Sequence, residues 1–370
     1  MQQIDPRLTD AKLKSIEAIA ARLNIEGLKR VARELVGPCP VCGGKDRFSI
    51  NKDMGVYNCR TCGGGDVIRL VELVQGCDFK EALQWLCGDA EVKIDPEEAK
   101  RREARFKKEQ QRRDGESDRY RQYARKRAYD NWTSALPAKG TIVEEYLRLR
   151  GLPLADIPAC IRFHPDLPYV KKIGGKNTRL HSGPAMVAAI QLPDGRFSAL
   201  HQTWLDVSQP KGKALIFDPE GAQISAKLYA GPKKTCAIRL HTPEGASTLV
   251  MGEGIETTAS AWVADVIPNA AYWAGVDLGN MAGRQVKEKG KRHSGVPDLV
   301  SGADGFVPPP WVKRLIYVMD GDSNPKDTRA KLLAGCRRAI ARCPGLVASI
   351  VSAETGRDLN DMIMGEPDNG

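Results

Sequence analysis

Four cysteines near the N-terminus constrain the fold more than any other feature of the sequence. They form the pattern C-x2-C-x16-C-x2-C, whose members are Cys39, Cys42, Cys59 and Cys62. A tetrahedral Zn²⁺ binds four thiolates at about 2.3 Å, and each C-x-x-C turn presents two of them. The residues between the two pairs alternate in polarity, which is typical of short strands. The sequence therefore predicts a zinc ribbon with one structural Zn²⁺, which explains the spacing better than redox chemistry at either pair.

The rest of the composition is that of an ordinary globular protein. A chain of 370 residues with 42% hydrophobic and 28% charged residues is long enough for two or three domains. The six cysteines outside the ribbon follow no spacing pattern, which favours a reducing cytoplasm over a disulfide scaffold. We find no secretory signal and no stretch near the roughly 18 apolar residues of a membrane span. We therefore expect a cytoplasmic protein without a membrane partner.

Positive charge is concentrated in one segment. The net charge is +10, and residues 100–127 contain thirteen Lys or Arg against five Asp or Glu. This segment lacks proline and is rich in helix-forming residues, so it predicts an exposed basic helix or a pair of helices. A solvated linker and a phosphate-binding element explain such a segment equally well.

Helical patterns flank the ribbon. Residues 10–23 and 27–35 have helical periodicity before it, and two more helices are expected after it, with Asp66 and Asp78 as their N-caps. The ribbon also has basic and aromatic residues of the kind that bind single-stranded bases by stacking. Its two aromatic residues have an alternative role in the core of so small a module. The predicted template-binding residues of the ribbon are Lys45, Arg47, Phe48, Tyr57 and Arg60.

Three apolar stretches in the last third of the chain are each followed by acidic residues. Strands alternating with helices indicate a parallel sheet, and such sheets bind ligands beyond the carboxyl ends of their strands. The acidic groups should therefore converge at one edge, where Mg²⁺ would relieve their repulsion. Each group alone has an alternative role as a helix cap or a turn residue. The residues are Glu253 after the first stretch, Asp320 and Asp322 after the second, and Asp358 and Asp361 after the third.

Several segments resemble those of DNA primases. The ribbon followed by "GGGDVIRLVELVQGCDFKEALQWL" (63–86) is similar to the zinc-binding domain of bacterial and phage primases. All four ligands are cysteines, as in the phage and plasmid branch, whereas bacterial replicative primases usually use one histidine. Residues 144–165, 184–206 and 225–234 resemble, in this order, parts of the primase RNA-polymerase core.

The acidic motifs resemble the Toprim domain that primases share with some topoisomerases, recombination-mediator proteins and certain nucleases. The family glutamate maps onto Glu253 and its D-x-D onto Asp320 and Asp322, while its last acidic motif maps onto Asp358 and Asp361. Two features depart from the family. Replicative primases have an aspartate where this chain has Thr257, directly after Glu256, and residues 283–310 form a long basic insertion, which leaves the position of a second metal in doubt.

The resemblance implies a DNA primase that makes RNA primers on single-stranded DNA from NTPs, with Mg²⁺ or Mn²⁺ as the catalytic metal. Glu253, Asp320 and Asp322 would be catalytic. A Toprim nuclease and a non-enzymatic recombination mediator are the alternatives. The nucleotide would contact Lys227, Lys233 and Lys234. The template groove would contain Lys171, Lys172, Lys176 and Arg179.

The implied fold class is multidomain α/β. The expected segments are a zinc-binding domain (1–90), a basic helical linker (91–135), the N-terminal part of the primase core (136–243) and a Toprim domain (244–370). "GPKKT" at 231–235 is too short for a P-loop, so a separate replicative helicase is expected as a partner.

Overall fold

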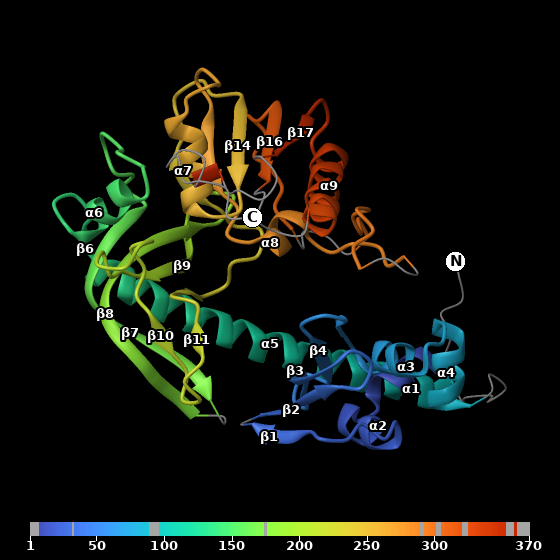
Figure 1. Cartoon of the computed structure of the whole chain (residues 1–370). Coiled ribbons are helices and arrows are strands. Elements are labelled where there is room, and N and C mark those ends of the chain that lie inside the picture. The colour runs from blue at the N-terminus through green and yellow to red at the C-terminus, as the bar shows by residue number, and fades with distance from the viewer. Residues whose placement is uncertain are drawn as a thin grey trace. The chain divides into compact units, whose positions relative to one another are not determined.

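The computed structural model describes residues 7–31, 33–88, 96–173, 176–288, 292–300, 305–319, 325–352 and 359–360 (Figure 1). The chain divides into two compact units, each of which is described by itself. The first comprises Met1–Tyr120 and Val170–Thr178, and the second comprises Arg121–Tyr169 and Arg179–Gly370. In the described ranges, no helix is both long and apolar enough to span a membrane.

An antiparallel sheet of five strands forms the centre of the first unit, and its strands are neighbours in sequence order (Figure 1). Apolar side chains of the sheet and of the surrounding helices form one core, with Phe48, Ile50 and Leu70 fully buried. The strands are β1 (Lys29–Val31), β2 (Glu34–Cys39), β3 (Gly43–Asn51), β4 (Val56–Cys59) and β5 (Gly63–Gly65). The helices are α1 (Arg7–Leu13), α2 (Ile16–Arg22), α3 (Val67–Gln75) and α4 (Phe79–Cys87).

Both predicted helix caps after the ribbon are confirmed. Asp66 accepts hydrogen bonds from the backbone N–H groups of Ile68 and Arg69, at 3.1 and 3.2 Å. Asp78 forms a capping box with Glu81 at the start of α4. These contacts satisfy N–H groups that have no partner inside the helix, and so they fix where α3 and α4 begin.

The helix expected over residues 27–35 is wrong, because this segment forms β1 and the start of β2. Leu35 pairs with Ile50 of β3, so the sheet provides the backbone hydrogen bonds that the helix would have made. Pairing within a sheet overrides local helix propensity in this way. The helix expected over residues 10–23 is also interrupted: Ser15 ends the first turns and caps α2 by accepting from the Ala18 N–H.

The predicted basic segment is confirmed as one helix, α5 (Pro96–Ser134), which is 39 residues long. Its first part contacts the ribbon unit. The Lys12 ammonium lies 5.8 Å from the centre of the Phe106 ring. A Cβ atom on Gly55 would lie 2.6 Å from Arg113 Nη1, so the turn between β3 and β4 comes very close to α5.

The second unit contains two sheets of five strands each. The first has the strand order β12-β9-β8-β7-β6 and joins β8 to β9 through a turn at Pro193–Gly195, which confirms the predicted hairpin. Gly195 has a φ of +89°, a conformation that favours glycine. The strands are β6 (Leu136–Pro137), β7 (Ile161–Ile173), β8 (Lys176–Gln191), β9 (Phe197–Trp204) and β12 (Lys227–Ala230). A small hairpin, β10 (Ile216–Phe217) and β11 (Gln223–Ile224), precedes β12.

The second sheet confirms the predicted parallel arrangement. Strands β14, β15, β16 and β17 are parallel, and β13 pairs antiparallel with β15 at one edge. In the order β13-β15-β14-β16-β17, the strand that follows β14 in sequence, β15, lies on one side of β14, and the later strands β16 and β17 lie on the other side. The boundary of β14 and β16 is therefore the topological switch point, where open α/β sheets bind ligands. The strands are β13 (Ile238–His241), β14 (Thr248–Gly252), β15 (Ala271–Ala274), β16 (Arg314–Met319) and β17 (Val347–Ser352).

Helices cover both faces of this parallel sheet (Figure 1). Leu249 and Tyr317 pack in a cluster with residues of α9, whereas Val250 and Ile316 pack in a cluster with Trp262 of α7. Successive residues of β14 and β16 thus point to opposite faces, and both faces are buried. The helices of this unit are α6 (Ile142–Leu149), α7 (Ile255–Val263), α8 (Leu278–Ala282) and α9 (Pro325–Arg342).

Candidate functional site

The four cysteines of the ribbon form a metal-binding site, as predicted. Their sulfur atoms all lie within 4.8 Å of one another. The Cys39–Cys62 and Cys42–Cys59 sulfur pairs are 3.9 and 3.5 Å apart, close to the roughly 3.8 Å that tetrahedral zinc–sulfur geometry implies. Backbone N–H groups of Thr61 and Cys62 also donate to Cys59 Sγ. Four converging thiols, one of which accepts backbone hydrogen bonds, fit one Zn²⁺.

The surroundings of the cluster favour a thiolate, the form that binds metal. Burial raises the pKa of Cys42, but hydrogen bonds from Cys62 and Cys59 outweigh it. Together with hydrogen bonds from Cys39 and Arg47, they lower this pKa to about 7.

Two of the predicted template-binding residues of the ribbon are in its core. The Phe48 and Tyr57 side chains are 0% and 2% exposed and stack on each other, with ring centres 5.7 Å apart. They are not accessible to bases, so their predicted stacking role is wrong and the alternative core role is correct. The basic residues remain at the surface: Lys45 is exposed, Arg47 donates to Thr61, and Arg60 pairs with Asp46 at 3.5 Å.

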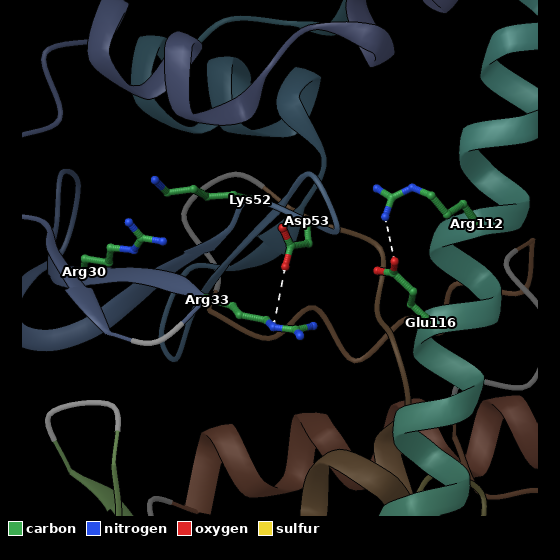
Figure 2. Close-up of a pocket in the computed structure, with 6 residues that line it drawn as sticks. All are labelled: Arg30, Arg33, Lys52, Asp53, Arg112 and Glu116. Atoms are coloured by element: carbon green, nitrogen blue, oxygen red, sulfur yellow. Dashed lines mark hydrogen bonds and ion pairs between the residues drawn. The ribbon is translucent and has the colours of Figure 1, made fainter.

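A basic groove lies at the end of the ribbon sheet away from the zinc ligands (Figure 2). It has a volume of about 420 Å³ and lies between the turns of the sheet and α5. One ion pair lies on each side of it, Arg33–Asp53 at 4.0 Å on the ribbon and Arg112–Glu116 at 2.6 Å on α5. Four cationic and two acidic side chains leave an excess of positive charge, which suits an anionic ligand. We call it the ribbon groove; it is lined by Arg30, Arg33, Lys52, Asp53, Arg112 and Glu116.

The second unit contains a polar cavity of about 380 Å³ beside the switch point of the parallel sheet. Charged side chains from the C-cap of α6, from the antiparallel sheet and the loop before β10, and from the turn after β14 with the start of α7 line it together. The lining residues are Arg150, His201, Lys211, Lys213, Lys227, Tyr229, Glu253, Gly254, Glu256, Thr257 and Val276. Two predicted site residues, Glu253 and Lys227, are therefore brought to one cavity.

Glu253 follows the last residue of β14. Its Oε1 accepts a hydrogen bond from the Leu278 N–H, at 3.3 Å, at the start of α8. Burial raises the pKa of this carboxyl group, and the carboxylate of Asp277 adds to that effect. Lys331 and Lys227 oppose it only from a distance, because among the described residues no cation forms an ion pair with Glu253.

Glu256 lies one turn further along and has the opposite surroundings. Its side chain is 7% exposed, and its Oε1 is 3.0 Å from both Lys213 Nζ and Lys227 Nζ. The buried Tyr146 hydroxyl donates to the same oxygen, at 2.7 Å. Burial alone would raise the pKa of Glu256, but the two lysines outweigh it and hold that pKa well below its usual value.

The other predicted nucleotide-binding lysines have different environments. Lys233 Nζ is 2.7 Å from Asp277 Oδ2 and lies 3.9 Å from the centre of the Tyr229 ring. Lys234 is exposed at the neighbouring position. The predicted template residues Lys171, Lys172, Lys176 and Arg179 are all exposed and lie at the end of β7 and the start of β8.

Four predicted metal ligands lie outside the described residues, namely Asp320, Asp322, Asp358 and Asp361. The segments next to them are described. Strand β16 ends at Met319 and is parallel to β14. Asn360 is buried and donates to the Arg150 carbonyl at 2.6 Å and to Ser260 Oγ at 3.2 Å, so the last motif contacts a residue that lines the cavity.

The sequence prediction missed the group of Glu256, Lys213 and Tyr146. Glu256 is visible in the sequence only as the neighbour of Thr257, and nothing in the local pattern identifies its partners. Lys213 lies in a loop, and Tyr146 fits the apolar face of α6. An unusually buried carboxylate can be recognised only once the fold is known.

Comparison with known proteins agrees with the ribbon. A family described as the zinc-binding domain of primase-helicase matches residues 36–68. A second family, described only as a domain of unknown function, matches residues 122–240.

Solved structures that are similar to this chain include three primases. The zinc-binding and RNA polymerase domains of the Aquifex aeolicus primase are 14% identical, with 98% of this chain and 83% of that chain covered and a TM-score of 0.32. A DnaG primase catalytic domain bound to ssDNA is 14% identical, with 66% and 76% covered and a TM-score of 0.35. The primase fragment of the bacteriophage T7 primase-helicase protein is 10% identical, with 89% and 94% covered and a TM-score of 0.29.

The four-cysteine site and the family match cover the same residues. Residues 36–68 of this chain are therefore similar to the zinc-binding domain of primase-helicase.

Proposed function

We propose that this chain is a DNA primase, which joins ribonucleoside triphosphates into short RNA primers on a single-stranded DNA template. The observation that carries the proposal is the cavity in the second unit. It combines Glu253, a half-buried carboxylate without a cationic partner among the described residues, with Lys213 and Lys227, next to the switch point of a parallel sheet. The primase-helicase type of the ribbon supports the same function.

The surroundings of Glu253 fit a hard divalent cation, which prefers oxygen ligands. Residue 320 directly follows β16, the parallel neighbour of β14, so its carboxylate would leave the sheet at the same edge as Glu253. Mg²⁺ or Mn²⁺ bound there would make a ribose 3′-hydroxyl more acidic and offset charge on the pyrophosphate leaving group. Residues 244–370 would thus be a Toprim catalytic domain. The proposed ligands are Glu253, Asp320, Asp322, Asp358 and Asp361.

Lysines around the cavity would bind the triphosphate. Lys227 lines the cavity, and Lys233 lies beside it on the turn after β12. Ammonium groups donate charge-assisted hydrogen bonds to phosphate oxygens, so they can orient the nucleotide for in-line attack. Lys234 would add a further positive charge at the rim.

The first unit would bind the DNA template. The exposed basic residues near the zinc site, the ribbon groove and the positive charge of α5 all favour contact with phosphates. Lys171, Lys172, Lys176 and Arg179 would extend this contact. The four segments 1–90, 91–135, 136–243 and 244–370 would then act as ribbon, linker, core and catalytic domain, and a separate helicase would supply the unwound strand.

A single reaction distinguishes this function from its alternatives. Purified protein is incubated with circular single-stranded DNA, Mg²⁺ and labelled NTPs, and both the label and the DNA are followed on denaturing gels. Short labelled oligonucleotides that alkali degrades are the expected result. Nicked DNA without labelled products would instead support a Toprim nuclease, and DNA binding with neither product would support a recombination mediator.

A further inference from the structure

Glu256 is a buried carboxylate to which the proposed chemistry assigns no role. One of its oxygens accepts from three donors, Lys213 Nζ, Lys227 Nζ and the Tyr146 hydroxyl, and the other accepts from Lys227 at 3.1 Å. These donors come from a loop, from β12 and from α6, of which α6 is far from the other two in the sequence. Glu256 therefore joins three separate elements at the wall of one cavity.

The charges of this group do not cancel. Two ammonium groups share one carboxylate, which leaves one positive charge facing a cavity that also contains Arg150 and Lys211. His201 adds none, because burial and the nearby Lys227 lower its pKa to about 3. Each ammonium has three N–H donors, so both lysines keep donors for a further anion.

The two acidic residues of this turn differ in a way that separates their roles. Glu253 has no cationic partner among the described residues, which suits a metal ligand, whereas Glu256 is saturated by cations. Glu256 lies in the first turn of α7, where the helix N-terminus favours a carboxylate. The helix therefore favours a charged carboxylate at this position in addition to the lysines that it contacts.

We propose that Glu256 is a positioning residue for polyphosphate binding. It holds the ammonium groups of Lys213 and Lys227 side by side, so that their remaining N–H groups contact the triphosphate of an incoming nucleotide. Since both nitrogens lie 3.0 Å from the same oxygen, they are at most about 6 Å apart, a span that one phosphate chain can bridge. This inference rests on the proposed primase function.

The test measures inorganic tripolyphosphate, in buffers without added divalent metal, as a competitor of a fluorescent nucleotide. Glu256→Gln should bind tripolyphosphate about tenfold more weakly, because Lys213 and Lys227 lose the carboxylate that holds them in place. A tenfold loss corresponds to one charge-assisted hydrogen bond between a lysine and the phosphate chain. Glu256→Asp keeps the charge but is too short to reach all three donors, so it should bind at least about threefold more weakly. Glu244→Gln, at an exposed position in the same unit, is the matched control and should bind as wild type does.

Kinetics provide a second readout that a loss of folding would not reproduce. In primer synthesis, Glu256→Gln should raise the KM for NTPs about tenfold and leave kcat nearly unchanged, as expected for a lost binding contact. Should this variant not fold, Lys213→Met tests the same pair, because its side chain is 26% exposed. It should weaken tripolyphosphate binding to a similar extent.

Equal or tighter binding by Glu256→Gln would overturn the inference, since Glu256 would then only offset charge. Unchanged binding by Lys213→Met would overturn it as well. A wild-type protein that binds tripolyphosphate as predicted but makes no primers would contradict the proposed function and leave the inference standing. If the wild type makes primers and the Glu256 variants bind tripolyphosphate as it does, the inference is contradicted and the proposed primase function stands.

Discussion

The buried hydroxyl of Tyr146 allows a quantitative test of the cavity. Replacing Tyr146 by Phe removes one hydrogen bond to the Glu256 carboxylate, at 2.7 Å, and leaves the fully buried ring in place. A hydrogen bond to a charged group contributes roughly 1.5–3 kcal/mol. We therefore expect the free energy of unfolding of the second unit to fall by about 2 kcal/mol, which lowers the Tm of a unit of this size by about 4–8 °C.

Tryptophan fluorescence during thermal and urea unfolding measures this change, because Trp204 and Trp273 are fully buried in the second unit. Tyr120→Phe is the control, since Tyr120 is 74% exposed on α5, and it should leave the transition unchanged. A loss below about 0.5 kcal/mol for Tyr146→Phe would refute the reasoning, because the hydroxyl would then contribute no more than an exposed contact.

Three further predictions concern zinc, DNA and pH. Metal analysis should find one Zn²⁺ in the wild-type ribbon and none in Cys62→Ser, whose ribbon should become sensitive to protease because metal binding contributes folding energy. The control Cys77→Ser should keep the metal. A ribbon that is stable without metal would contradict this prediction. Arg30→Gln in the ribbon groove should weaken binding of single-stranded DNA and reduce the slope of the log binding constant against log salt concentration by about 0.7. The control Lys14→Gln, at an exposed position, should change neither. Equal slopes for Arg30→Gln and the wild type would show that the groove does not bind DNA. Burial lowers the pKa of His201 to about 3, so below about pH 6.5 the unfolded chain binds more protons than the folded chain. The free energy of unfolding of the second unit should therefore fall by up to about 1.4 kcal/mol per pH unit as the pH falls from about 6.5 towards 3. His201→Gln should flatten that dependence and His181→Gln should not; an unchanged slope in His201→Gln would show that other groups cause it.

Local chemistry explains which features were predictable from the sequence. Cysteine spacing specifies a zinc ribbon because the metal requires a fixed donor geometry, and Asp66 and Asp78 are recognisable because capping depends on adjacent backbone groups. The parallel sheet follows from the alternation of apolar strands with helices. Each of these features is marked by a pattern that can be recognised without knowing the tertiary contacts.

The features that sequence reasoning missed depend on distant partners. Residues 27–35 form strands because β3 pairs with them, and Phe48 and Tyr57 are buried because α3 and α4 complete the core around them. The role of Glu256 requires Tyr146 and Lys213, which only the folded second unit brings together. Asp320 and Asp322 remain predictions, since they lie outside the described residues.

Primer synthesis by carboxylate variants tests the central claim most directly. Glu253→Gln, Asp320→Ala and Asp322→Ala should each lower the yield of RNA primers on single-stranded DNA by at least about 100-fold, because each would remove a proposed ligand of the proposed catalytic metal. The exposed control Glu244→Gln should retain wild-type yield, and all four variants should bind one Zn²⁺. Near-normal primer yield from Asp320→Ala, Asp322→Ala or Glu253→Gln would contradict the account.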